Sequence, residues 1–224
     1  MKLCVPSYLF PGTWLENLEA MVALEWIQGV ELLFFSYDED ARRILAEERE
    51  RIAALSGRFE LSLHLPDPLS DADEELVAAT RDFVKLYVLH PPTSGALAWA
   101  ALVGSWRSRY GDDFLLEYTG AEAFAQAEAR APGLPLCADT GRLLKDGISP
   151  ALWMQERAVR LREIHLHTLR GGRDHVPLDP DEQWLRELGP FLRGFCGRLE
   201  LELFSGADVE ASRAALELSM GGFA

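Results

Sequence analysis

The stretch FELSLHLP, residues 59–66, is a short apolar run that ends in a histidine, and it sets a pattern that recurs along the chain. Segments with helical spacing of apolar residues separate it from similar runs on either side. The eight runs are Lys2–Ser7, Val30–Phe35, Phe59–Leu65, Tyr87–Leu89, Phe114–Tyr118, Leu134–Ala138, Glu163–Thr168 and Leu199–Phe204. This alternation predicts eight strands, each followed by a helix.

A helix between successive strands predicts a parallel sheet, because each crossover carries a helix. Eight such units can close into a barrel, and 224 residues suffice for one. We therefore predict a small (β/α)₈ TIM barrel that forms a single domain over residues 1–224. An open doubly wound sheet is the alternative, but no G-x-G-x-x-G or G-x-x-x-x-G-K-[ST] motif follows any predicted strand.

The overall charge argues against a nucleic-acid partner. The chain has 36 acidic and 22 basic residues and a net charge of −14, whereas nucleic-acid binding draws its affinity from Lys and Arg. No apolar run of about 18 residues and no signal-peptide pattern are present. We expect a soluble cytoplasmic protein with no membrane partner. Its three cysteines, Cys4, Cys137 and Cys196, are expected to be buried reduced thiols.

The positions of the histidines point to a site. All five fall at or just beyond the C-terminal end of a predicted strand, which is the end of a TIM barrel that carries the active site. A lone histidine there is more often structural, but these five would converge on one barrel mouth. Two of them are separated by one residue and share a strand face, inward being the expected direction. The histidines are His64, His90, His165, His167 and His175.

Carboxylates follow the same rule. Glu117, Asp139 and Glu202 end the fifth, sixth and eighth predicted strands, each among apolar neighbours. A buried charge must be paired or bind a metal, and imidazole with carboxylate suits Zn²⁺, Mn²⁺ or Fe²⁺. We predict one or two divalent ions at the mouth. Glu200 shares a face with Glu202, but Glu202 is nearer the strand end and is the preferred ligand.

Three arginines lie near these strand ends. Arg142 follows Asp139 at a fixed spacing, and Arg170 and Arg173 flank two glycines after the seventh strand. A guanidinium can hold a phosphate by two hydrogen bonds. We predict that all three bind substrate, with solvated loop charges as the alternative for Arg170 and Arg173.

Taken in order, the strand-end motifs resemble those of the xylose isomerase-like (AP endonuclease type 2) barrel superfamily over nearly the whole chain. Three further stretches are most similar to the cobamide remodelling phosphodiesterases within it: P-S-Y-L-F-P-G-T, V-E-L-L-F-F and L-H-L-P-D-P-L. The strand-end motifs are H-L-P, L-H-P-P, L-E-Y, D-T-G, H-L-H, D-H-V-P-L and a C-terminal L-E-L.

The resemblance implies a ligand set. Glu117, Asp139, His165 and Glu202 match the core metal ligands of the superfamily. His64, His90 and His175 match positions that bind further metals in its DNA-repair members.

The sequence departs from the DNA-repair pattern at Arg142, where those nucleases have a histidine. Arginine stays protonated and cannot bind a metal. The aspartate expected before His175 is also displaced, to Asp174. Fewer metals and a directly bound phosphate follow.

These features predict metal-dependent hydrolysis of a small phosphodiester. By resemblance, the substrate is the nucleotide loop of a cobamide. Metal ions would lower the pKa of bound water towards about 7. Glu117 would be essential, and Arg142 and His167 would stabilise charge that develops on the phosphate.

Three alternatives remain open. A sugar isomerase or epimerase on the same barrel would use Glu117 and Glu202 to shuttle protons; such enzymes usually add a lysine near the seventh strand or a catalytic glutamate pair, and the only nearby lysine is Lys145. An abasic-site endonuclease would bind DNA in a salt-dependent manner. A non-catalytic ligand-binding barrel would tolerate loss of Glu117 or Asp139.

Overall fold

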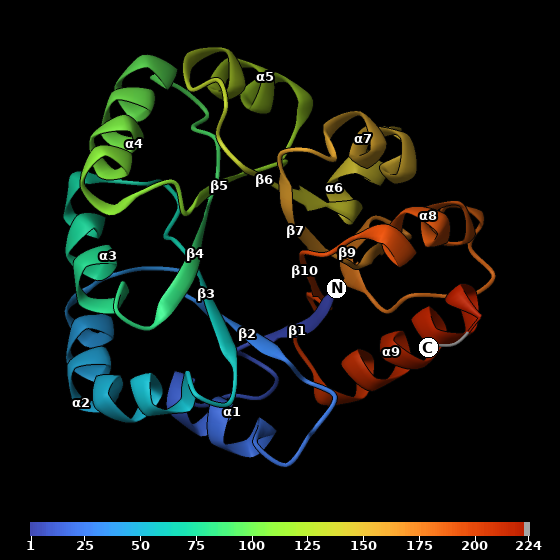
Figure 1. The fold of residues 1–224 in the computed structure, drawn as a ribbon, viewed down its shortest axis with the longest axis horizontal. Helices are drawn as coiled ribbons and strands as arrows, with labels where there is room; N and C mark the ends of the chain where they lie inside the picture. The colour runs from blue at the N-terminus through green and yellow to red at the C-terminus, as the bar shows by residue number, and fades with distance from the viewer. Residues whose placement is uncertain (222–224) are drawn as a thin grey trace.

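The computed structural model describes residues 1–221, in which eight parallel strands close into a barrel surrounded by helices (Figure 1). Each barrel strand pairs with the next barrel strand along the chain, and the last one closes the ring on the first. The prediction of a (β/α)₈ TIM barrel is confirmed. The barrel strands are β1 (Lys2–Pro6), β2 (Gly29–Leu33), β3 (Glu60–His64), β4 (Val84–Leu89), β5 (Phe114–Glu117), β6 (Leu136–Asp139), β7 (Leu161–His165) and β10 (Arg198–Glu200).

The helices form a ring outside the barrel, and their buried faces pack on the strands (Figure 1). Among the described helices, none is long and apolar enough to cross a membrane. They are α1 (Trp14–Met21), α2 (Glu39–Leu55), η1 (Asp71–Asp73), α3 (Glu74–Thr80), α4 (Ala96–Tyr110), α5 (Ala121–Arg130), α6 (Thr140–Lys145), α7 (Pro150–Arg157), α8 (Gln183–Gly194) and α9 (Gly206–Met220).

The chain after β7 differs from the prediction. Instead of one strand to Thr168 and a loop, it forms an antiparallel hairpin of β8 (Thr168–Arg170) and β9 (Arg173–Val176). Gly171 and Gly172 make the turn at φ 60° and 76°, where a side chain would be strained. His175 therefore lies on a strand that folds back over the mouth.

Two other predictions need correction. The eighth barrel strand ends at Glu200 rather than Phe204, because the Leu203 N–H donates to the carbonyl of Leu201 and the chain turns out of the sheet. Cys4 and Cys137 are buried free thiols as expected, but Cys196 is exposed.

The side chains inside the barrel form an apolar cluster and a polar cluster. Val88, Leu115 and Cys137 form a small apolar cluster, separate from the large core between sheet and helices. Elsewhere inside the barrel, Arg198 and Glu163 are almost completely buried and hydrogen-bonded. Polar side chains thus fill much of the interior beneath the mouth.

Candidate metal centre

A cavity of about 280 Å³ opens at the C-terminal ends of the barrel strands. Its lining combines apolar side chains with ionisable groups. It is lined by Leu33, Phe34, Phe35, His64, Leu65, Asp67, His90, Glu117, Asp139, Arg142, His175, Glu202 and Phe204. The structure therefore brings most of the predicted site residues to one place.

Glu117 lies at the centre of the first group. His64 Nε2 and His90 Nε2 each lie 3.0 Å from the same oxygen, Glu117 Oε2. His64 Nδ1 faces the carbonyl of Leu65 at 3.0 Å, and His90 Nδ1 faces Asp67 at 3.2 Å. Both partners are acceptors, so each Nδ1 can donate a proton to its partner. In a neutral imidazole, Nε2 then offers a lone pair towards Glu117, an arrangement that suits a shared cation.

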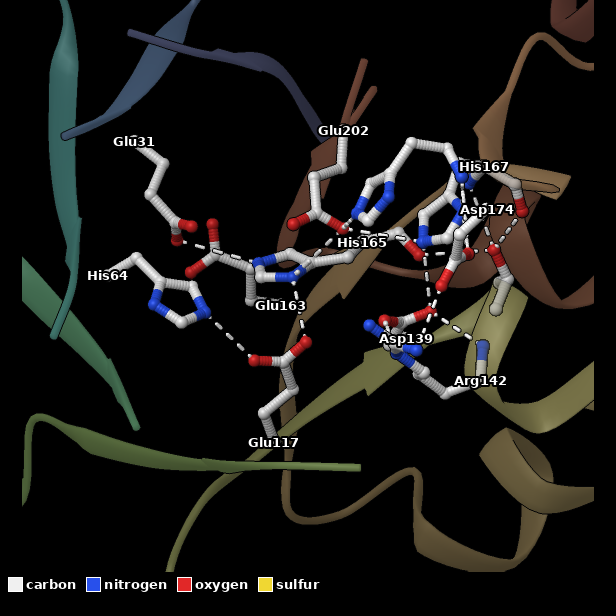
Figure 2. A network of polar contacts seen from close by, with 12 residues as sticks. Glu31, His64, Glu117, Asp139, Arg142, Glu163, His165, His167, Asp174 and Glu202 are labelled. Atoms are coloured by element: carbon white, nitrogen blue, oxygen red, sulfur yellow. Dashed lines mark hydrogen bonds and ion pairs between the residues drawn. The ribbon is translucent and has the colours of Figure 1, made fainter. Parts of the chain in front are cut away.

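His165 connects the mouth to the barrel interior, as Figure 2 shows. Its Nδ1 lies 3.2 Å from Glu117 Oε1 and 3.6 Å from Glu202 Oε2, both at the mouth. Its Nε2 points the other way, 3.5 Å from Glu31 Oε2. The ring is completely buried between these carboxylates.

A second group forms around Asp139, which ends β6 and also caps α6. Its Oδ1 accepts from the backbone N–H of Arg142 at 2.9 Å and lies 3.0 Å from His167 Nε2. His167 Nε2 is 3.4 Å from Glu202 Oε2, and so is His175 Nε2. The two imidazoles stack with ring centroids 4.3 Å apart. The hairpin thereby adds His175 to a site formed by the end of β6 and the segments that directly follow β7 and β10.

Of the three predicted arginines, only Arg142 reaches the cavity. Its Nη1 pairs with Asp174 Oδ2 at 2.9 Å, and about one third of the side chain stays exposed (Figure 2). Arg170 and Arg173 lie on the exposed hairpin outside the cavity lining, where Arg170 pairs with Glu182. Their predicted role in substrate binding gains no support from this placement.

The buried charges shift one another's pKa values. Burial alone would raise the pKa of Glu117, but His90 and His165 outweigh it and hold that pKa well below its usual range. The pKa of Glu202 is also held well below its usual range, because His165 and His167 outweigh the effect of burial. Burial opposes protonation of His90 and His167, yet the facing carboxylates raise both pKa values to about 10. Without a metal, the facing carboxylates thus favour the protonated form of both imidazoles.

The donor set fits a divalent metal. Asp139, His167 and Glu202 place one ligand atom each within 4.8 Å of one another, as do His64, His90 and Glu117. His167 Nε2 and Glu202 Oε2 are buried, and although they lie 3.4 Å apart and His167 Nε2 is 3.0 Å from Asp139, neither atom makes a well-directed hydrogen bond among the described residues. Nitrogen and oxygen donors of this kind bind Zn²⁺, Mn²⁺ or Fe²⁺. The imidazole between Asp139 and Glu202 is His167, whereas the resemblance gave the core position to His165.

Some site residues escaped the sequence reasoning. Asp67 orients His90, and its signal was its place in the loop directly after the third strand. Glu31 and Glu163 lie inside the barrel, and a glutamate within an apolar strand was a signal for each. Glu202 reaches the cavity and Glu200 does not.

The barrel is similar to several solved structures, although the sequence matches no family model and no curated protein. A D-tagatose 3-epimerase-like protein superposes with a TM-score of 0.73 at 14% identity, covering 99% of this chain and 97% of that one. L-ribulose 3-epimerase gives 0.69 at 16%, with 99% and 95% covered. Endonuclease IV from Thermus thermophilus gives 0.58 at 17%, with 97% and 99% covered. At these identities the likeness shows a shared fold.

Proposed function

We propose that the chain is a metal-dependent isomerase or epimerase that moves a proton on a small polyhydroxy carbonyl compound. The observation that carries the proposal is the pair Glu117 and Glu202. Both line one small cavity, both lie within 3.6 Å of His165 Nδ1, and both have pKa values held well below the usual range. An ionised carboxylate can remove a proton, and once protonated it can return that proton as an acid, so carboxylates that line one substrate-sized space suit proton transfer on a small substrate.

The residues have separate roles. Asp139, His167 and Glu202 would hold the metal, and a bound divalent ion would polarise the substrate carbonyl. Either Glu117 or Glu202 removes the proton from the carbon beside the carbonyl and, now protonated, returns that proton to the substrate. Arg142, fixed by Asp174, binds a substrate oxygen at the rim.

Two further points support this proposal. Several proteins with this barrel are described as sugar epimerases, which favours membership of the xylose isomerase-like superfamily and this reaction class. The cavity, about 280 Å³, is at the small end for ligand sites and suits a molecule the size of a monosaccharide.

Hydrolysis of a small phosphodiester is the second candidate. The group of His64, His90 and Glu117 favours it, because two adjacent metals can stabilise the attacking and leaving oxygens of a phosphoryl transfer. The endonuclease IV barrel is also among the similar structures. A cobamide substrate stays a prediction drawn from the sequence resemblance, and a cavity of this size would enclose only part of such a molecule.

The test is solvent exchange. The protein, loaded with Mn²⁺ or Zn²⁺, is incubated with a panel of ketoses in D₂O, and NMR follows deuterium incorporation beside the carbonyl. In parallel, a chromogenic phosphodiester and adenosylcobalamin report hydrolysis. We expect metal-dependent exchange for at least one ketose, and loss of exchange in Glu117→Gln and Glu202→Gln.

The matched control is Glu50→Gln, an exposed glutamate on α2 far from the cavity lining. It should behave as wild type. Phosphodiester cleavage with no exchange on any ketose would overturn the isomerase proposal and leave the second candidate.

A further inference from the structure

Below the mouth cavity, the barrel encloses a second set of ionisable side chains. Glu31 comes from β2, Glu163 and His165 from β7, and Glu200 from β10, and all four are completely buried. Strand register places Glu200 opposite His165 and Arg198 opposite Glu163. Except for His165, none of them belongs to the groups at the mouth, and Glu31, Glu163 and Glu200 do not line the cavity.

Arg198 is a cation inside this part of the barrel, and each of its three guanidinium nitrogens already donates a hydrogen bond. Its Nε donates to Glu163 Oε1 at 2.8 Å, its Nη2 to Ser62 Oγ at 2.7 Å, and its Nη1 to the carbonyl of Glu60 at 2.8 Å. Its carboxylate partners are Glu163, at 2.8 Å, and the partly exposed Glu60, at 3.5 Å. The ion-pair partner of Glu31 is then only the His165 imidazole, at 3.5 Å, and Glu200 has no ion-pair partner among the described residues, which is costly for carboxyl groups in a low-dielectric interior.

The unused atoms converge. Glu163 Oε2, Glu31 Oε1 and both carboxylate oxygens of Glu200 are buried and have no hydrogen-bond partner among the described residues. His165 Nε2 is likewise without a hydrogen-bond partner, and it points at the same set, as Figure 2 shows for Glu31 and Glu163. One ligand atom from each of the four residues lies within 4.8 Å of the others.

We propose that Glu31, Glu163, His165 and Glu200 bind a second divalent cation, sealed inside the barrel beneath the mouth. Three carboxylates and one imidazole suit Zn²⁺ or Mn²⁺. Four protein ligands leave no open position, as in structural metal sites. Ligand atoms around one ion are at most about 4.2 Å apart, twice a bond of about 2.1 Å, so small rotations of the glutamate side chains complete the site.

This ion has a structural role and goes beyond the proposed reaction. It ties β2, β7 and β10 together and fixes the His165 ring from below. Nδ1 of that ring then donates to Glu117 at the mouth, so the buried ion positions a mouth carboxylate through one imidazole. The mouth retains His167 as the imidazole between Asp139 and Glu202.

Metal content of matched variants tests the proposal. Wild type, Glu200→Gln, Asp139→Asn and Glu50→Gln are expressed with added Zn²⁺ or Mn²⁺, dialysed against the same buffer and measured by mass spectrometry for metal per chain. Glu200→Gln should bind about one ion per chain fewer than wild type, because it lacks a ligand of the buried site. Asp139→Asn should keep the buried ion after a brief treatment of the folded protein with chelator. Glu50→Gln should match wild type.

Two measurements keep the test decisive if Glu200→Gln fails to fold. Glu31→Gln removes a different ligand of the same site. Wild type grown with Co²⁺ should show the intense visible absorption of a low-symmetry four-coordinate ion that persists in Asp139→Asn. Equal metal content in wild type and the folded buried-site variants, with no persistent Co²⁺ spectrum, would overturn the proposal. A shared proton would then occupy the cluster in place of a metal, since burial and Glu31 raise the pKa of Glu200.

Discussion

Gly141 shows how a single hydrogen atom in place of a side chain shapes the centre. A Cβ at this position would lie 2.1 Å from His167 Cε1 and 2.8 Å from Asp174 Oδ1. Neither neighbour can move freely, because His167 is fully buried and Asp174 pairs with Arg142. The glycine of D-T-G-R therefore lets the His167 ring lie against the start of α6.

We expect Gly141→Ala to displace His167 from Asp139 and Glu202. A displacement of about 1 Å at a reacting centre costs about 10²-fold in turnover, so activity should fall by that order and metal affinity with it. Turnover and metal titration measure both. Gly104→Ala, on the exposed side of α4 with open space around it, is the control and should leave both unchanged. Full activity in Gly141→Ala would contradict the placement of His167.

The raised pKa values of His90 and His167 predict how the metal-free protein responds to pH. An imidazole whose pKa rises on folding stabilises the fold fully below its unfolded value of about 6.5. That stabilisation is lost as the pH rises through the folded value, which is about 10 for both residues. Urea midpoints of chelator-treated protein should therefore fall between pH 7 and pH 9.5.

The same protons compete with metal, so metal affinity should rise over this pH range. His90→Gln should weaken the pH dependence of the urea midpoint. A midpoint in wild type that is flat or rises with pH would show that His90 and His167 are neutral in the metal-free fold.

At the scale of elements, Arg198 joins three barrel strands. It lies on β10 and donates to Glu163 on β7 and to Ser62 and the carbonyl of Glu60 on β3. Arg198→Met leaves Glu163 buried without a partner, which costs about 3–5 kcal/mol of unfolding free energy. Adding Glu163→Gln should recover part of that loss, and urea denaturation measures both variants.

An exposed ion pair is the matched comparison. Arg186 pairs with Asp181 and is about half exposed, so Arg186→Met should cost less than about 1 kcal/mol. An equal loss for Arg186→Met and Arg198→Met would contradict the importance of the buried pair.

The elements also show what a sequence can and cannot predict. Periodicity located all eight barrel strands, because parallel strands buried on both faces are apolar runs that helices separate. The hairpin after β7 was missed, since its short strands are polar and the decisive signal was only Gly171-Gly172. Pairings such as Glu117 with His64 and His90 join residues far apart in the chain, and spacing carries no information about them.

At the scale of the whole molecule, the net charge disfavours a nucleic-acid substrate relative to a small molecule. A net charge of −14 repels a polyanion, although the endonuclease IV barrel has the same fold. We expect the protein not to bind a DNA duplex that contains an abasic site at about 50 mM salt. Fluorescence anisotropy of a labelled duplex measures this binding. Binding that weakens steeply with added salt would instead favour the nuclease alternative.

The barrel mouth brings three carboxylates, at or just beyond strand ends, and four imidazoles together from segments spread over most of the chain. The most direct test of a metal centre there is anomalous X-ray scattering from crystals grown with Mn²⁺ or Zn²⁺. We expect a strong anomalous peak between Asp139, His167 and Glu202. Absence of a peak at the mouth, with His64 and His90 bonded directly to Glu117 and His167 to Asp139, would show that protons alone hold these groups together and would contradict a metal centre.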